Sequence, residues 1–501
     1  MRRESTPIEA ATTGERLPQV IQGGMGVAIS SWRLASCVSR MGQLGVVSGT
    51  ALAVVLARGL QEGDRDGHLR RALAAFSDPA VADRILERYF RPNGLPPGRA
   101  YRAVPVPRQR PSRHFLELTV AGTFVEVFLA KDGHDGAVGI NLLEKIQIPT
   151  LPALYGAILA GVDWVLMGAG IPRRIPAVLA ELAEHRPASL PFAVAGAAAE
   201  DDYELRFDPR RVVPDSPTPL RPPRFLAIVG SHTLASHLDR DEESRPFGFV
   251  VERPVAGGHN APPRGALRLN AAGEPAYGPR DEVDLGRMRG LGSPFWLAGG
   301  YGHPERLREA IEEGACGVQV GTAFALCEES GLDPALKQSA RELARAGELD
   351  VRTDPVASPT GYPFKVVDLQ GTVAEPAVYA SRTRRCDLGY LTTPYRKPDG
   401  TIGYRCPAEP PADYLAKGGR AEDLPGRVCL CNGLTAAAGL AQRRRRGGAE
   451  PALLTLGDDA CAVLAELSPD GGPYQARDVV RHLLAPPPPS RSGEPRAGRS
   501  G

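Results

Sequence analysis

Short apolar runs alternate with amphipathic helical patterns along most of the chain. This alternation is typical of strand–helix units that assemble a parallel sheet, whose strands are apolar on both faces. A further stretch, residues 115–130, is rich in β-forming side chains and is predicted to be β-structure. The chain is therefore predicted to be an α/β protein. Its predicted strands lie at residues 17–22, 44–48, 137–142, 163–167, 192–194, 225–229, 247–251, 295–297 and 317–320.

The helical patterns between these runs have recognisable ends. A helix is predicted to begin after Ser31, whose hydroxyl suits the N-cap position. Residues 69–89 are predicted to form one or two amphipathic helices. Further helices are predicted over residues 151–160, 175–185 and 304–314. Each of these three follows a predicted strand, as strand–helix units require.

Glycine and small polar residues recur directly after the predicted strands. In a (β/α)8 TIM barrel these positions form the C-terminal rim of the strands, where barrel enzymes have their active sites. An open doubly wound sheet would give the same alternation, so strand counting alone leaves the architecture open. The length of 501 residues suits one barrel with additions, because a barrel takes about 250 residues or more. We place the predicted barrel at residues 16–345.

The composition changes on both sides of the predicted barrel. Residues 1–15 and 485–501 lack an apolar pattern and are predicted to be disordered. Residues 346–484 contain more proline, arginine, glycine and cysteine and few clean strands. We predict that this segment is an irregular C-terminal extension packed on the barrel.

Overall charge and hydropathy argue against several classes of protein. A net charge of +2 gives no electrostatic reason to expect a nucleic-acid or membrane-surface partner. The N-terminus lacks the apolar segment of a signal peptide, and no run approaches the roughly 18 apolar residues of a membrane span. We therefore expect a cytoplasmic protein whose eight cysteines are reduced.

Two glycine turns late in the predicted barrel have the properties of a phosphate site. They are Ala-Gly-Gly-Tyr-Gly at 298–302 and Val-Gly-Thr-Ala-Phe at 320–324. Glycine lets backbone N–H groups approach a phosphate, and barrels commonly bind phosphate after strands seven and eight. Thr322 adds a hydroxyl donor. For either turn alone, a glycine that merely ends a strand would be the simpler explanation.

His259 occupies a conspicuous position among the nine histidines. It directly follows the predicted strand 247–251 and the pair Gly257-Gly258, so its ring is expected to project over the rim pocket. A lone histidine is more often structural than catalytic. Here the position favours a function, since a near-neutral pKa suits a side chain that removes a proton.

Other rim positions could contact a flat ring system. The turn Gln-Gly-Gly-Met-Gly at 22–26 lacks the spacing of a dinucleotide-binding loop and suits either an approach to such a ring or a plain tight turn. Asn141 ends a strand and could hydrogen-bond a flavin edge, and Lys145 could place a positive charge near its N1–C2 region. A helix cap and a surface lysine are the alternatives for these two residues.

Four of the cysteines, Cys386, Cys406, Cys429 and Cys431, fall in the predicted extension. Four thiolates can form a closed tetrahedral zinc site, which would stabilise a region with little regular core. Their spacing does not match a paired C-x-x-C ribbon, so reduced, partly buried thiols are the alternative.

Four motifs together resemble the nitronate monooxygenase (2-nitropropane dioxygenase-like) family of FMN-dependent TIM-barrel flavoproteins. They are Gln-Gly-Gly-Met-Gly at 22–26, Ala-Gly-Gly-His at 256–259, Ala-Gly-Gly at 298–300 and Gly-Thr-Ala-Phe at 321–324, and they occur in the family's order. The resemblance covers roughly residues 16–335. The sequence departs from the family in two places. One is a long insertion after strand six of the predicted barrel, the run at 247–251, and it extends to about residue 293. The other is the cysteine-bearing extension.

The resemblance implies an FMN cofactor and a catalytic base at His259. It also implies phosphate contacts at Gly299, Gly300, Gly321 and Thr322. Further cofactor contacts are expected at the rim positions Gly24, Met25, Asn141, Lys145, Gly168, Gly257 and Gly258.

Three functions follow from these features. The first is oxidation of alkyl nitronates by O2 to a carbonyl compound and nitrite. The second, which the same superfamily includes, is an NAD(P)H-dependent enoyl-acyl carrier protein reductase, with acyl carrier protein as partner. The third is a non-catalytic scaffold that binds flavin or phosphate. The insertion and the extension leave the substrate open.

Overall fold

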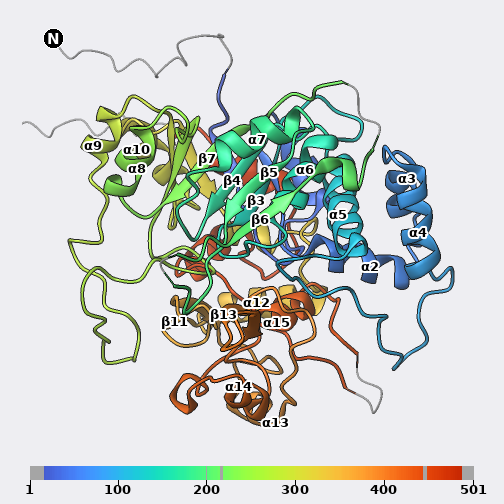
Figure 1. Cartoon of the computed structure of the whole chain (residues 1–501). Coiled ribbons are helices and arrows are strands. Elements are labelled where there is room, and N and C mark those ends of the chain that lie inside the picture. The colour runs from blue at the N-terminus through green and yellow to red at the C-terminus, as the bar shows by residue number, and fades with distance from the viewer. Residues whose placement is uncertain (1–15, 199, 215–217, 444–447, 488–501) are drawn as a thin grey trace, which may run out of the picture.

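The computed structural model describes residues 16–198, 200–214, 218–443 and 448–487 (Figure 1). The two segments that we predict to be disordered, 1–15 and 485–501, lie outside the described residues except for 485–487. No helix in the described ranges is long and apolar enough to cross a membrane.

Eight parallel strands form the centre of the molecule. Neighbouring strands pair in parallel around the sheet, and its two outer strands meet through a parallel bridge between Ile21 and Leu44. There the Gln22 N–H donates to the Leu44 carbonyl at 2.9 Å, and the Leu44 N–H donates to the Val20 carbonyl at 3.1 Å. The sheet is therefore closed, and the predicted (β/α)8 TIM barrel is confirmed. In spatial order the strands are β1 (Val20–Gln22), β10 (Gly317–Val320), β9 (Phe295–Ala298), β8 (Gly248–Glu252), β7 (Arg224–Val229), β4 (Trp164–Gly168), β3 (Val138–Leu143) and β2 (Gly45–Ser48).

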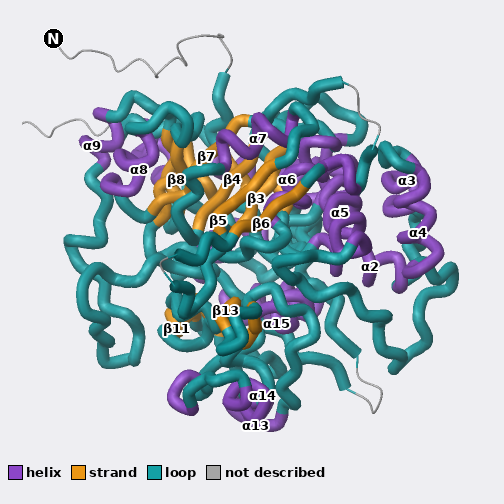
Figure 2. The backbone as a smooth tube through the Cα atoms, in the orientation of Figure 1, coloured by secondary structure: helices purple, strands orange, loops and turns teal. Residues whose placement is uncertain are grey.

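Alternate residues of the strands build two separate cores, because successive side chains point to opposite faces of a sheet. On β7, Leu226 belongs to one core, whereas its neighbours Phe225 and Ala227 belong to the other. The core that contains Phe225 and Ala227 lies between the strands and the helices that surround them (Figure 2). The core that contains Leu226 fills the inside of the barrel, and its members are Ile21, Leu44, Val46, Trp164, Leu166, Leu226, Val250, Trp296 and Ala298.

One predicted element is wrong in type. Residues 115–130, predicted to be β-structure, lie within the 19-residue helix α5 (Arg113–Lys131), which the Ser112 side chain caps by accepting from the Phe115 N–H. The helix is buried on almost every side between its neighbours, so its β-branched and aromatic residues face protein all round. Tertiary packing overrides the local β-propensity here.

The run at residues 192–194 is not a barrel strand either. The strand nearby is β5 (Ala188–Pro191), which pairs antiparallel with β6 (Glu204–Phe207) outside the barrel. Ser31 does cap the first helix as predicted, accepting a hydrogen bond from the Leu34 N–H. The helices of this part of the chain are α1 (Trp32–Ser39), α2 (Leu52–Gln61), α3 (His68–Ala74), α4 (Pro79–Tyr89), α5, α6 (Thr150–Leu159), α7 (Ile175–Ala183), η1 (Pro209–Arg211), α8 (His232–Asp239), α9 (Leu285–Gly290), α10 (Pro304–Glu312) and α11 (Thr322–Ala325).

The residues that follow the barrel form a cap on one end of it, seen below the strands in Figure 1. Two short antiparallel pairs lie in this region, β11 (Val351–Asp354) with β12 (Phe364–Val367) and β13 (Thr393–Arg396) with β14 (Ile402–Arg405). The helices of this region are α12 (Pro334–Ala346), α13 (Pro376–Ser381), α14 (Pro411–Ala416), η2 (Ala421–Asp423), α15 (Leu430–Ala437), α16 (Ala460–Leu467) and α17 (Ala476–Leu483). Of these, α17 packs against α1 and α10, among the helices that surround the barrel.

The close packing of α6 on α5 gives a test of this architecture. A Cβ added to Gly156 would lie 2.3 Å from the Val120 carbonyl oxygen, so Gly156→Ala must push the two helices apart. We expect a loss of roughly 1–3 kcal/mol of stability from this overpacking. Thermal denaturation followed by circular dichroism measures it. Gly290→Ala, where an added Cβ meets no atom within 4 Å, is the matched control, and equal midpoints for the two variants would contradict the packing.

Candidate active site at the barrel rim

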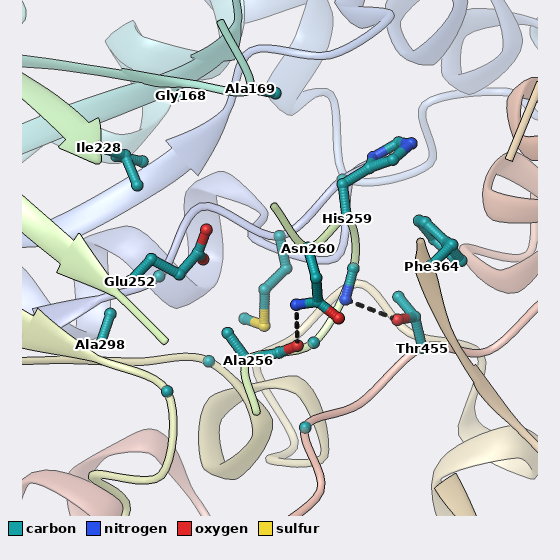
Figure 3. A pocket seen from close by; sticks show the side chains of 18 of the residues that line it. Gly168, Ala169, Ile228, Glu252, Ala256, His259, Asn260, Ala298, Phe364 and Thr455 are labelled. Carbon is teal, nitrogen blue, oxygen red and sulfur yellow. Dashed lines mark hydrogen bonds between the residues drawn. The ribbon is translucent and has the colours of Figure 1, made fainter. Parts of the chain in front are cut away.

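A cavity of about 500 Å³ lies at the C-terminal ends of the barrel strands (Figure 3). This is the end at which barrel enzymes bind substrates, and the volume is in the range of small-molecule sites. Segments of the cap complete its wall. Of the residues predicted from the sequence, those that line the cavity are Gly24, Met25, Asn141, Gly168, Gly257, Gly258, His259, Gly299, Gly300, Gly321 and Thr322.

The first glycine turn is held tightly against β3. A Cβ on Gly24 would lie 2.2 Å from Cβ of Asn141, so only glycine fits there. The Asn141 Nδ2 donates to the Gly24 carbonyl at 3.1 Å, whereas its Oδ1 is buried without a hydrogen-bond partner. The Gln319 Oε1, also at the cavity, is buried and unpaired in the same way. Because buried acceptors are normally satisfied, these two oxygens point to a ligand that supplies donors.

The two late glycine turns follow the neighbouring strands β9 and β10, and the second of them lies beside the first glycine turn, where the Gly23 N–H donates to the Val320 carbonyl at 2.8 Å. Gly299 and Gly300 have φ angles of +86° and +79°, which favour glycine. The Arg253 Nη1 lies 3.9 Å from the position of a Cβ on Gly300, and no carboxylate of the described residues is within ion-pairing distance of Arg253. This guanidinium contacts Tyr301 but, in the described part of the chain, no carboxylate, and a cluster of backbone N–H groups beside it suits an anion such as a phosphate. Nothing in the sequence distinguishes Arg253 from the chain's other arginines.

Part of the cap reaches these turns. The Thr322 hydroxyl accepts a hydrogen bond from the Gly457 N–H at 2.9 Å, and its own proton remains available to a ligand. Asp459 lines the cavity nearby, and burial raises the pKa of its carboxyl. Segment 455–459 therefore completes the rim opposite the barrel turns.

His259 is held by the loop that follows β8 and by the cap. Its Nε2 lies 2.7 Å from the Ser358 Oγ, and its ring makes an edge contact with Phe364 at 4.9 Å between centroids. The preceding Gly258 is fixed from both sides, since its N–H donates to the Thr455 Oγ1 at 2.8 Å and its carbonyl accepts from the Lys365 N–H at 2.9 Å. The ring therefore has a set position at the cavity wall.

The electrostatic setting makes the His259 ring neutral. Burial and, as the smaller cause, the charge of Lys145 together lower its pKa to about 4. Lys145 itself does not line the cavity. Its Nζ lies 2.6 Å from the centroid of the Tyr362 ring, and that ring does line the cavity. Burial lowers the pKa of Lys145 to about 8, against the opposing effect of Glu144.

Glu252 is a site residue that the sequence reasoning missed. It is the last residue of β8, and Figure 3 shows its carboxyl group directed into the cavity. Burial raises its pKa to about 7, so the group can hold or release a proton near neutral pH. The signal was available, because a single acidic residue ends an otherwise apolar strand at the rim.

The four cysteines of the cap lie together away from the barrel turns. Cys406 and Cys429 belong to one packed cluster with Ala408, and Cys386 and Cys431 pack against it. Cys431 also lines the cavity. All eight cysteines of the chain are free thiols.

Comparisons with known proteins give structural likeness only. No protein-family model matches the chain, and no curated protein matches it. FabK from Thermotoga maritima is similar with a TM-score of 0.47 at 14% identity, over 93% of this chain and 91% of that chain. A nitroalkane oxidase from Streptomyces ansochromogenes is similar with a TM-score of 0.43 at 14% identity, over 93% and 94%. The enoyl reductase domain of MlnA, from the macrolactin biosynthesis cluster of Bacillus amyloliquefaciens, has a TM-score of 0.38 at 12% identity, over 71% and 64%.

These names include both kinds of enzyme that the sequence resemblance suggests, a nitroalkane-oxidising and an enoyl-reducing one. At 12–14% sequence identity, the activities in these names are statements about those proteins alone. The barrel of this chain is established by its own strand pairing, and its chemistry has to be argued from its own cavity.

The raised pKa of Glu252 has a consequence for stability. Its value of about 7 lies above the usual 4.5, so its contribution to stability is complete below pH 4.5 and is lost as the pH rises through 7. Glu252→Gln removes this dependence. We expect the thermal midpoint of the wild type to fall relative to that of the variant as the pH rises from about 5 to about 8. The pKa of Glu126 is also raised to about 7. Because Glu126 is present in both proteins, its effect on the thermal midpoint cancels when the two are compared. Parallel midpoints across this range would contradict the burial of an unpaired carboxyl.

Proposed function

We propose that this chain is an FMN-dependent oxidoreductase whose flavin binds in the rim cavity. One observation carries the proposal. Two glycine turns, with an arginine that has no carboxylate partner among the described residues, meet unpaired amide oxygens around one largely apolar cavity. A ligand with an anionic group and a flat ring that carries hydrogen-bond donors satisfies both sets of groups at once.

The residues present fit FMN. The N–H groups of Gly299, Gly300 and Gly321 and the hydroxyl of Thr322 would hold its phosphate, with the charge of Arg253 beside them. The raised pKa of Asp459 reduces the repulsion between that carboxyl and a phosphate.

Other residues of the same cavity wall fit the flavin ring. The free oxygens of Asn141 and Gln319 would accept hydrogen bonds from the ring edge. Gly24, which has no side chain, lets Asn141 pack directly on the first glycine turn and so fixes this amide at the cavity wall.

When bound, FMN supplies a carrier that accepts two electrons from one reactant and passes them to another. The protein supplies binding, orientation and protons. Glu252, whose raised pKa of about 7 lets it hold a proton up to near neutral pH, can donate that proton to a substrate in the cavity. His259, neutral and anchored by Ser358, can orient a substrate by a hydrogen bond.

Two reactions remain for such a site, and the pKa of His259 bears on the choice between them. Oxidation of a neutral nitroalkane requires a base that removes the α-proton, and a ring with a pKa of about 4 is a weak base at neutral pH. Reduction of an enoyl thioester requires no such base. It requires a proton donor, for which Glu252 is suited, and space for an acyl chain.

The cap supplies that apolar space. The cavity wall includes Leu388, Leu391, Leu430, Leu434 and Leu453, all from the segments that follow the barrel. We therefore place NAD(P)H-dependent reduction of an enoyl thioester, which an acyl carrier protein would present, ahead of nitronate oxidation. A nitronate that arrives already ionised needs no base, so its oxidation by O2 is the second candidate.

The phosphate position is tested by Gly300→Asp. The new side chain places a negative charge where the phosphate would bind, on a residue with positive φ. We expect the purified variant to lose at least nine-tenths of its bound FMN, measured by visible absorbance after gel filtration. Gly290→Asp, at an open surface position, is the control and should retain the full content. A fully loaded Gly300→Asp protein would refute this placement.

The reaction is tested by anaerobic mixing of the flavin-loaded protein with NADPH or with an alkyl nitronate, followed by stopped-flow absorbance. We expect NADPH to bleach the flavin and a short enoyl thioester to restore its colour. Bleaching by the nitronate alone would establish the monooxygenase instead. Bleaching by neither reactant would overturn both assignments in favour of a non-catalytic scaffold.

A further inference from the structure

Four cysteine thiols converge in the cap from three separate segments. Cys406 directly follows β14, Cys429 immediately precedes α15, and Cys431 lies in the first turn of that helix. Cys386 comes from the loop after α13. Cys406 and Cys429 are each 6% exposed and form the centre of the cluster, and the other two thiols pack against them. Between Cys386 and Cys406 lie 19 residues, and between Cys406 and Cys429 lie 22, so the fold itself brings these thiols together.

Backbone and side-chain donors are directed at these sulfur atoms. Burial raises the pKa of all four thiols, and neighbouring thiols of the cluster raise it further at Cys386, Cys406 and Cys431. Hydrogen bonds from the N–H groups of Ala408, Asn432 and Leu391 oppose this effect at Cys406, Cys429 and Cys431 respectively.

The Asn432 Nδ2 also lies 3.7 Å from the Cys429 Sγ, within donating distance. Donors around a sulfur atom are the usual outer support of a metal-bound thiolate.

We propose that Cys386, Cys406, Cys429 and Cys431 bind one zinc ion as a closed, structural four-thiolate site. Zinc is a metal that four thiolates hold in tetrahedral geometry, with Zn–S distances of about 2.3 Å and therefore S–S distances of about 3.8 Å. In the described part of the chain, any three of these four sulfur atoms include at least one pair that is more than 4.8 Å apart. Zinc binding therefore draws the three segments closer together.

The location gives this site a role in the cavity. Leu388 and Tyr390 follow Cys386, and Leu430 and Leu434 flank Cys431; all four line the cavity. The zinc ion thus ties together two of the segments that form the apolar wall. This part of the cap has only short two-stranded sheets and short helices, so a metal crosslink supplies order that its core does not.

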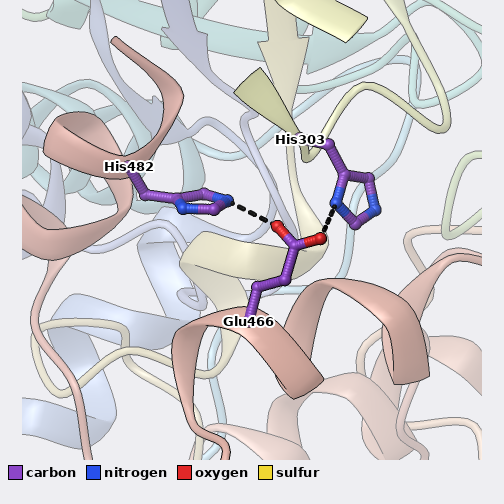
Figure 4. A group of neighbouring side chains, drawn as sticks. All are labelled: His303, Glu466 and His482. Atoms are coloured by element: carbon purple, nitrogen blue, oxygen red, sulfur yellow. Dashed lines mark hydrogen bonds and ion pairs between the residues drawn. The ribbon is translucent and has the colours of Figure 1, made fainter. Parts of the chain in front are cut away.

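A second group of metal-ligating residue types lies elsewhere, at His303, Glu466 and His482 (Figure 4). Its ligand atoms all lie within 4.8 Å of one another. The carboxylate of Glu466 already pairs with the Nδ1 of His303 at 3.0 Å and with the Nε2 of His482 at 2.9 Å. These side chains are partly exposed, and ion pairing accounts for their arrangement. The group must nevertheless be controlled for in any metal analysis.

The test is the metal content of the flavin-loaded protein, purified without chelator and measured by mass spectrometry of the elements. We expect one zinc per chain in the wild type, in Glu466→Gln and in Cys316→Ser, a partly buried cysteine outside the cluster. Cys386→Ser and Cys431→Ser should each lose at least nine-tenths of the zinc. Absence of zinc from the wild type, iron in its place, or loss of zinc in Glu466→Gln would each overturn the proposal.

A second measurement uses the wild-type protein, so its result does not depend on whether the cysteine variants fold. Titration with an organomercurial should release zinc to a metallochromic indicator in step with modification of the buried thiols. Modification without zinc release would overturn the proposal. The flavin content plays no part in this readout, so the zinc site stands or falls independently of the proposed activity.

Discussion

The barrel closes where β1 meets β2, and the buried side chain of Gln22 is central to that junction. Its Oε1 accepts from the Val46 N–H at 2.9 Å, and its Nε2 donates to the Ser30 Oγ at 2.8 Å. The Ser30 hydroxyl in turn donates to the Gly23 carbonyl at 2.7 Å. One amide therefore joins the last residue of the first strand to the second strand and to the first glycine turn. Because a closed sheet fixes where every strand ends, this junction also sets the rim on which the cavity is built.

The cavity has two differently built sides. The barrel supplies backbone and small polar groups at strand ends, which suit the polar parts of a ligand. The cap supplies leucines and two tyrosines, which suit an apolar substrate. The loop after β8 joins the two sides, because its Gly258 and Asn260 hydrogen-bond to the cap segment around β12. His259, between them, is therefore positioned by the barrel and by the cap together.

Burial sets the protonation of the ionisable groups around this cavity. Burial disfavours the charged form of an acid and of a base alike, so it raises the pKa of Glu252 and lowers that of His259. The acid consequently keeps its proton near neutral pH, whereas the imidazole stays unprotonated. This distribution suits proton donation by the carboxyl group better than proton removal by the imidazole. The resemblance to nitronate monooxygenases leads to the opposite emphasis, on His259 as a base.

The sequence by itself determined the alternation of strands and helices and most of the glycine-rich strand ends, and the structure decided that the sheet closes into a barrel. Strands buried on both faces leave continuous apolar runs, and strand ends that need close backbone approach leave glycines, so both can be read without a structure. Only the tertiary structure decided that residues 115–130 form a helix, because their β-forming residues are buried all round by neighbouring helices. It likewise placed Arg253 beside Gly300 and Lys145 behind Tyr362. Surroundings of this kind come from residues far apart in the chain, and the pKa values of Glu252 and His259 depend on them in the same way.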